Sequence, residues 1–327
     1  ISLKKIVKPL SSEVMVNLLY QIIRTARPRQ WLKNLSVFAA PIFAGLLFVG
    51  DTFSLTIRAF FAFCAISSGA YFLNDIVDAP KDRAHPIKKN RAIASGKLPV
   101  GLASIISIVL IVGSLIYSFA FLDTFFSLML IVYIILQLSY SFYLRNVIIL
   151  DSLIVATGFV IRVFAGGFAS RASVSSWLAL TTIGISMLLA FGKRRSEKTI
   201  LRKYISEDQI ETRKTLRHYP DTLLDSMISM SAAYTIFTYS LFAFMISPSG
   251  ISRKFSGLLP SVLKSPKLLM LTIPVVIYGI ARYLYVIYEK NEGESPERAL
   301  LTDKPLLISV ILWGLLTLGL MFFLPEL

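Results

Sequence analysis

The sequence has few of the residues that form disulfides and metal sites. It contains one cysteine, Cys64, and two histidines, His85 and His218, in 327 residues. An internal disulfide and a cysteine-based metal site are therefore excluded, and a zinc site is not expected. Charged residues make up only 16% of the chain, compared with about 25% in soluble domains. This composition excludes a disordered chain, a secreted disulfide scaffold and an ordinary cytosolic enzyme.

Hydrophobic residues, by contrast, make up 55% of the chain, and the mean hydropathy is +0.68. A transmembrane helix needs about 20 mostly apolar residues. We therefore predict an all-α polytopic membrane protein with nine transmembrane helices. They are expected near 35–50, 54–77, 100–118, 122–139, 147–168, 174–192, 222–247, 267–288 and 305–325. Residues 1–34 are expected to form an interfacial segment, and residues 35–327 a single transmembrane domain.

The few charges are unevenly distributed, with 34 Lys and Arg against 19 Asp and Glu, a net charge of +15. The basic residues gather before the first expected span and in the loops after the second, sixth and eighth. The positive-inside rule then places the N-terminus in the cytoplasm, and nine spans place the C-terminus outside. The positive-inside rule accounts for the net positive charge without a nucleic-acid partner, and it is compatible with a polyanionic substrate. The sequence carries no signal for an oligomeric state.

The most informative acidic residues lie at the cytoplasmic end of the second expected span. Asn74, Asp78 and Asp82 fall within 80° of one another on a helix, and Asp75 lies near the same face. Like charges at this spacing need a counter-ion, and oxygen ligands of this kind suit Mg²⁺. The alternative is a solvated helix end at the membrane surface.

Basic and polar residues accompany this acidic cluster. The candidates for binding phosphate groups are Arg83, Lys89, Arg91, Tyr140, Arg145, Lys193 and Arg194. Each basic residue among them has the alternative role of a topology signal. Asp151 is either a further metal ligand or the cap of a helix N-terminus.

Arg162 and Arg282 lie inside expected spans, and three glycines lie in the span expected at 147–168. Arg282 lies close enough to the cytoplasmic end of its helix to reach the site, whereas Arg162 is deeper and is expected to be structural. Gly158, Gly166 and Gly167 are expected to permit close helix packing. The charged segment 194–221 is expected either to cover the site or to lie on the lipid headgroups.

At this point the chain resembles a known superfamily. Residues 74–82 read N-D-x-x-D-x-x-x-D, which is similar to the first acidic motif of the UbiA-type membrane prenyltransferases. Further stretches resemble the bacterial decaprenyl-phosphate phosphoribosyltransferase branch. They are residues 27–34, 85–88, 158–162, 192–195, 278–285, 296–297 and 301–306.

The resemblance implies a UbiA-like helical bundle in a bacterial plasma membrane, with its active site facing the cytoplasm. It implies Mg²⁺ as cofactor, 5-phosphoribosyl 1-diphosphate (PRPP) as donor and a polyprenyl phosphate as acceptor. Asn74, Asp78 and Asp82, with Asp75, are then expected to hold the metal on the donor diphosphate. Lys33, Arg145 and Arg282 are expected to position the acceptor phosphate.

Two other functions remain open. One is a conventional prenyltransferase of the same superfamily, which takes a polyprenyl diphosphate and an aromatic acceptor. The other is a transporter, which would place charges near mid-membrane on several helices.

Overall fold

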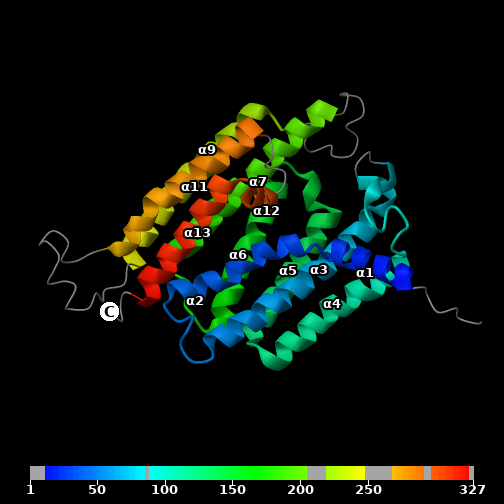
Figure 1. Ribbon diagram of the computed structural model, residues 1–327, viewed down its shortest axis with the longest axis horizontal. Coiled ribbons are helices and arrows are strands. Elements are labelled where there is room, and N and C mark those ends of the chain that lie inside the picture. The colour runs from blue at the N-terminus through cyan, green and yellow to red at the C-terminus, as the bar shows by residue number, and fades with distance from the viewer. Residues whose placement is uncertain (1–11, 85–87, 205–218, 247–266, 291–295, 324–327) are drawn as a thin grey trace, which may run out of the picture. The chain divides into compact units, whose positions relative to one another are not determined.

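The computed structural model describes residues 12–84, 88–204, 219–246, 267–290 and 296–323, and these are helical with no strand (Figure 1). The α-helices are α1 Ser12–Ala26, α2 Ala39–Phe43, α3 Thr52–Ala84, α4 Val100–Phe121, α5 Thr124–Phe142, α6 Leu150–Ser170, α7 Ser176–Tyr204, α9 Asp221–Ile246, α11 Ile273–Tyr285, α12 Pro296–Thr302 and α13 Lys304–Leu318. The 3₁₀ segments are η1 Pro28–Phe38, η2 Lys88–Asn90, η3 Leu144–Asn146 and η6 Leu268–Thr272. The π-helical turns are η7 Val286–Lys290 and η8 Gly319–Phe323.

Eight helices in the described part of the chain are long and apolar enough to cross a membrane. They are Thr52–Ala84, Val100–Phe121, Thr124–Phe142, Leu150–Ser170, Ser176–Thr199, Asp221–Ile246, Leu268–Lys290 and Lys304–Phe323. Each overlaps one of the expected spans, so the prediction of an all-helical, multi-pass membrane protein is confirmed.

The first expected span, at 35–50, is the exception, and the count of nine is not confirmed. The chain passes there from η1 to the five-residue α2. It then turns, with positive φ angles of +70° at Gly45 and +52° at Gly50. Part of this range packs inside the protein, where Val37 and Ala40 are fully buried, whereas Leu35, Phe48 and Val49 are exposed. The side of the membrane on which the N-terminus lies stays a prediction.

The chain divides into two compact units. The first comprises residues 1–28 and 64–114, and the second comprises residues 29–63 and 115–327. The functional division at residue 34 that the sequence suggested stays a prediction.

The first unit has a small core around the C-terminal half of α3. Phe72 and Ala79 pack there with Ile93 and Leu98, which follow η2. Helix α4 approaches α3 closely at Gly69, whose carbonyl accepts a hydrogen bond of 2.8 Å from Ser107 Oγ. Helix α1 joins the same core through Leu18 and Ile22 among others.

In the second unit, α7 packs against α6 and α9. One core cluster contains Leu188 and Phe191 of α7, Ile228 of α9 and Tyr283 of α11. A second cluster surrounds Phe43 and Phe242, whose rings meet edge to face with centroids 4.7 Å apart. These clusters hold the polar side chains described below in fixed positions.

Candidate functional site

The acidic cluster of the first unit lies on one uninterrupted helix. Asn74, Asp75, Asp78 and Asp82 all belong to α3, which continues to Ala84. Asp75 and Asp82 are each 5% exposed, whereas Asn74 and Asp78 are half-buried. Buried carboxylates need cationic partners, because an unpaired charge away from water is costly.

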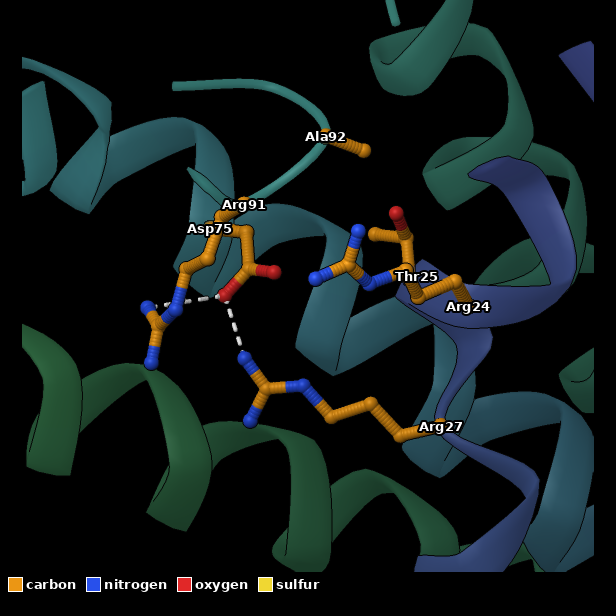
Figure 2. Close-up of a pocket in the computed structure, with 6 residues that line it drawn as sticks. All are labelled: Arg24, Thr25, Arg27, Asp75, Arg91 and Ala92. Atoms are coloured by element: carbon orange, nitrogen blue, oxygen red, sulfur yellow. Dashed lines mark hydrogen bonds and ion pairs between the residues drawn. The ribbon is translucent and has the colours of Figure 1, made fainter. Parts of the chain in front are cut away.

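Two arginines provide those partners in the structure. Arg27 Nη2 lies 2.5 Å from Asp75 Oδ1. Arg91 Nη1 lies 3.2 Å from the same oxygen and 2.7 Å from Asp82 Oδ2. Figure 2 shows both guanidinium groups converging on the Asp75 carboxylate. Arg27 adopts a left-handed φ of 54° and stacks over the Tyr71 ring, 4.8 Å from its centroid.

The chemistry of the donor set fits Mg²⁺. Within the described ranges, no three His, Cys, Asp or Glu side chains gather as a complete metal cage. Mg²⁺ does not need one, because it usually takes one or two carboxylates together with substrate phosphates. Asn74, Asp78 and Asp82 offer such oxygen atoms at one-turn spacing on α3.

The basic residues beyond α3 differ in their surroundings. Arg83 is exposed, and its Nε donates a hydrogen bond of 3.3 Å to the carbonyl of Ala94. Lys89 is exposed in η2. His85 and the rest of 85–87 lie outside the described residues.

In the second unit, Arg194 is the centre of a buried polar cluster. It is 2% exposed, and its Nε lies 2.6 Å from Asp151 Oδ2. Its Nη1 donates to Glu197 over 2.7 Å, and its Nη2 donates to the Tyr140 hydroxyl over 2.8 Å. Three residues predicted from separate segments therefore meet here: Tyr140, Asp151 and Arg194. Sequence reasoning had not included Glu197.

Asp151 is buried at the start of α6, and its role as a metal ligand stays a prediction. It sits in the first turn of α6, but the residue at the N-cap position is Ile149, which makes no side-chain capping hydrogen bond. Its carboxylate also accepts a hydrogen bond of 2.5 Å from the Tyr219 hydroxyl. Burial and the neighbouring Asp151 carboxylate raise the pKa of Tyr219 to about 12, so this hydroxyl remains a donor near neutral pH. No local sequence signal could have identified Tyr219.

The other predicted residues of this region lie beside the cluster. Lys193 Nζ is 3.9 Å from Glu197 Oε1. Arg145 is half-buried in η3. Of the segment 194–221, residues 194–204 continue α7, and residues 205–218 lie outside the described part of the chain.

Lys33 belongs to a separate buried group in the second unit. Its Nζ lies 3.5 Å from Glu297 Oε2, and Gln30 donates a hydrogen bond to the other oxygen of this carboxylate. Glu297 is 7% exposed and lies in the short helix α12. Burial lowers the pKa of Lys33, and the neighbouring Glu297 carboxylate opposes this shift.

Arg282 is held by Asp303. Its Nε and Nη2 each donate a hydrogen bond of 2.9 Å to one oxygen of the carboxylate. Lys290 Nζ lies 2.7 Å from the same side chain, which also caps α13 through the amide of Leu306. This arrangement ties α11, η7 and α13 together.

Arg162 has the structural role that its depth suggested. It is 5% exposed, and its Nε donates to Asn34 Oδ1 over 2.7 Å. Its Nη1 donates to the carbonyl of Gly158 over 2.6 Å, and its Nη2 donates to the Tyr133 hydroxyl over 3.1 Å. The guanidinium also lies 4.8 Å from the centroid of the Tyr133 ring. A buried charge with this many donors in use is positioned by packing.

Comparisons with known proteins agree with the fold and the motif. The model of the UbiA prenyltransferase family matches residues 38–311. The decaprenyl-phosphate phosphoribosyltransferase of Corynebacterium glutamicum is 32% identical over 91% of this chain and 85% of its own length. The protein of the same name from Mycolicibacterium smegmatis is 34% identical over 91% of each chain. A solved UbiA homolog from Archaeoglobus fulgidus, bound to GPP and Mg²⁺, is 17% identical with a TM-score of 0.65, covering 94% of this chain and 100% of its own.

Proposed function

The chain belongs to the UbiA prenyltransferase family, and from this premise we propose that it is a polyprenyl-phosphate phosphoribosyltransferase. It transfers the 5-phosphoribosyl group of PRPP to a decaprenyl-type phosphate and releases diphosphate. The observation that carries the proposal is the near full-length similarity to relatives that bear this name. The enzyme lies in a bacterial plasma membrane, with its site facing the cytoplasm, where PRPP is available.

In this proposal the acidic cluster of α3 binds the diphosphate of the donor, PRPP. Asn74, Asp78 and Asp82 hold Mg²⁺, which when bound neutralises charge on the diphosphate. Arg83, Lys89 and Arg91 are the candidates for direct contacts with donor phosphates. Groups of this kind lower the barrier because they stabilise charge that develops as the bond between C1 and the diphosphate oxygen breaks.

The acceptor phosphate needs a cation to orient it, and it does not need a general base. A phosphate monoester has a second pKa near 6, so it is largely dianionic at neutral pH. Its oxygen attacks C1 without first losing a proton to the protein. Lys33, Arg145 and Arg282 are the candidates for orienting the acceptor phosphate, and Lys193, Arg194 and Tyr140 are further candidates for binding phosphate groups.

Among the candidates for the acceptor, Lys33 has the surroundings that fit best. It shares the Glu297 carboxylate with Gln30, and its charge would be favoured by a phosphate dianion nearby. Nε and Nη2 of Arg282 both donate to Asp303, so Nη1 is the nitrogen that would contact the acceptor phosphate. The isoprenoid tail is expected to lie along apolar side chains that face the bilayer.

The test is diphosphate release by the purified full chain with Mg²⁺, PRPP and decaprenyl phosphate. Each component is omitted in turn, and the lipid product is identified by mass spectrometry. Release that requires all three components and yields a phosphoribosylated lipid supports the proposal. No release from PRPP, together with turnover of a polyprenyl diphosphate and an aromatic acid, would assign the conventional prenyltransferase activity instead.

A further inference from the structure

The first unit contains a pocket that the sequence did not indicate. It has a volume of about 180 Å³ and is lined by Arg24, Thr25, Arg27, Asp75, Arg91 and Ala92 (Figure 2). Water occupies about 30 Å³ per molecule in the liquid, so the pocket has room for a small polar group. Three arginines and one aspartate give its lining a net charge of +2.

Asp75 fixes two of the arginines. It is 5% exposed, and both Arg27 and Arg91 make their ion pairs with its Oδ1 atom. A guanidinium carries five N–H donors in a rigid fork. The contacts to described residues use a single nitrogen of each guanidinium, Nη2 of Arg27 and Nη1 of Arg91. The remaining donors of both side chains are therefore available to an anion.

Arg24 completes the positive lining. It comes from the last turn of α1 and has no hydrogen bond or ion pair with any residue that the structure describes. Figure 2 shows its side chain extending toward the Asp75 carboxylate. A cation placed there without a carboxylate of its own is suited to bind a ligand phosphate.

We propose that this pocket binds a phosphate monoester dianion and, in the proposed reaction, holds the 5-phosphate of PRPP. In this arrangement Asp75 is a positioning residue for Arg27 and Arg91, and it is not a metal ligand. The inference rests on the proposed function, because PRPP carries a phosphate at C5 in addition to the diphosphate at C1. A polyprenyl diphosphate has no second phosphate and would leave the pocket without a role.

The chemistry of the pocket distinguishes it from a diphosphate site. A metal-bound diphosphate needs anionic oxygens that are open to the metal. The one carboxylate in the pocket accepts from two arginines and is buried. The groups left to contact a ligand are therefore chiefly the arginine side chains, and this suits an anion that arrives without a metal. Apart from Ala92 the lining is polar, which favours a sugar phosphate over the headgroup of an isoprenoid lipid.

The probe for this proposal is ribose 5-phosphate, which has the monoester and lacks the diphosphate. The purified full chain in detergent, without divalent ions, is expected to bind it by calorimetry. Arg24→Gln and Arg27→Gln are each expected to weaken this binding about tenfold or more, because each removes charge-assisted hydrogen bonds. Lys97→Gln, at an exposed position outside the pocket, is the control and should keep the wild-type affinity.

Asp75→Asn distinguishes a positioning role from a purely electrostatic one, because the two roles predict opposite changes in the affinity for ribose 5-phosphate. The variant makes the pocket more positive, so simple electrostatics predicts tighter binding of ribose 5-phosphate. A positioning role predicts weaker binding, because Arg27 and Arg91 lose their common anchor. Thermal unfolding of each variant in detergent establishes that the protein measured is folded. Tighter binding by folded Asp75→Asn would contradict the positioning role.

Three further results would overturn the pocket assignment. The first is wild-type protein that binds PRPP but not ribose 5-phosphate. The second is loss of Mg²⁺-diphosphate affinity in Arg24→Gln and Arg27→Gln with ribose 5-phosphate binding intact. The third is a selective loss of decaprenyl phosphate binding in these variants. If wild-type protein instead binds ribose 5-phosphate through these arginines but makes no product from PRPP, the monoester pocket stands and the proposed function fails.

Discussion

At the scale of single residues, the predicted ligands are mostly engaged with one another. Asp75 and Asp82 share Arg91, and Asp151 pairs with Arg194. Charges in or near a membrane need such partners, because isolated ones are expensive to bury. These ion pairs fix the positions of the candidate side chains within each unit.

The sharpest residue-level prediction concerns Asp78. Asp78→Asn should lower turnover by about 10²-fold or more, the loss typical when one oriented stabilising group is removed. The substitution is isosteric, so the thermal unfolding midpoint in detergent should change little. Asp51→Asn is the matched control, because Asp51 is exposed and precedes α3. Full activity in folded Asp78→Asn would contradict a metal role for this carboxylate.

At the scale of elements, close packing depends on two adjacent glycines in α6. A Cβ atom at Gly166 would lie 1.9 Å from the Val37 carbonyl oxygen of η1, and one at Gly167 would lie 2.8 Å from Val174 Cγ2. These distances confirm the packing role expected for both residues. At Gly158 the nearest atom is the flexible Nη1 of Arg162, at 3.3 Å.

Gly166→Ala should therefore destabilise the protein strongly, because the clash is with backbone that has no room to move. Overpacking of this kind typically costs about 1–3 kcal/mol. Gly314→Ala in α13 is the control, since nothing lies within 4 Å of its Cβ position. Alanine favours a helix over glycine by about 1 kcal/mol, so this control should be neutral or stabilising. Thermal unfolding of both variants in detergent measures the difference, and equal midpoints would rule out the tight contact.

The ion pair between Arg282 of α11 and Asp303, which caps α13, should make the stability of the protein depend on pH in the acid range. The Arg282 guanidinium holds the pKa of Asp303 well below its usual range, which is near 3.9 in unfolded chains. The unfolded chain then binds more protons, so this contribution to stability is complete above about pH 4 and is lost as the pH falls toward the folded pKa. In Asp303→Asn the unfolding midpoint should be lower at neutral pH and should fall less steeply below about pH 4. If the unfolding midpoint of Asp303→Asn falls below about pH 4 as steeply as that of the wild type, Asp303 does not cause the loss of stability in acid.

At the scale of the whole molecule, the distribution of basic residues predicts how the chain crosses the membrane. The loop after α3 is expected in the cytoplasm, and the turn after α6 on the other side. The only cysteine, Cys64, is buried, so engineered cysteines can report on each side separately.

Ser95→Cys should react with a membrane-impermeant maleimide only when the cytoplasmic face is accessible, as in inverted vesicles. Ser173→Cys should react in intact cells, because it lies in the exposed turn after α6. The wild-type chain is the control and should remain unlabelled. Labelling of Ser95→Cys in intact cells would reverse the predicted orientation.

The helical membrane architecture and the shared face of Asn74, Asp78 and Asp82 could be predicted from the sequence alone. Both are local properties, since a span is a run of about 20 apolar residues and a helix face follows from its 3.6-residue period. The span expected at 35–50 is not confirmed, because an apolar run is compatible with burial in lipid and with burial in protein alike. Val37 and Ala40 are apolar to pack within their unit, in a 3₁₀ segment and a short helix.

Which polar side chains meet, in contrast, depends on how the helices pack. Arg27 and Asp75 are 48 positions apart, Asp151 and Tyr219 are 68 apart, and Gln30 and Glu297 are 267 apart. No periodicity connects residues at such separations. Their pairing results from helices packing within each unit, where a buried charge has to find whatever partner the fold brings within reach.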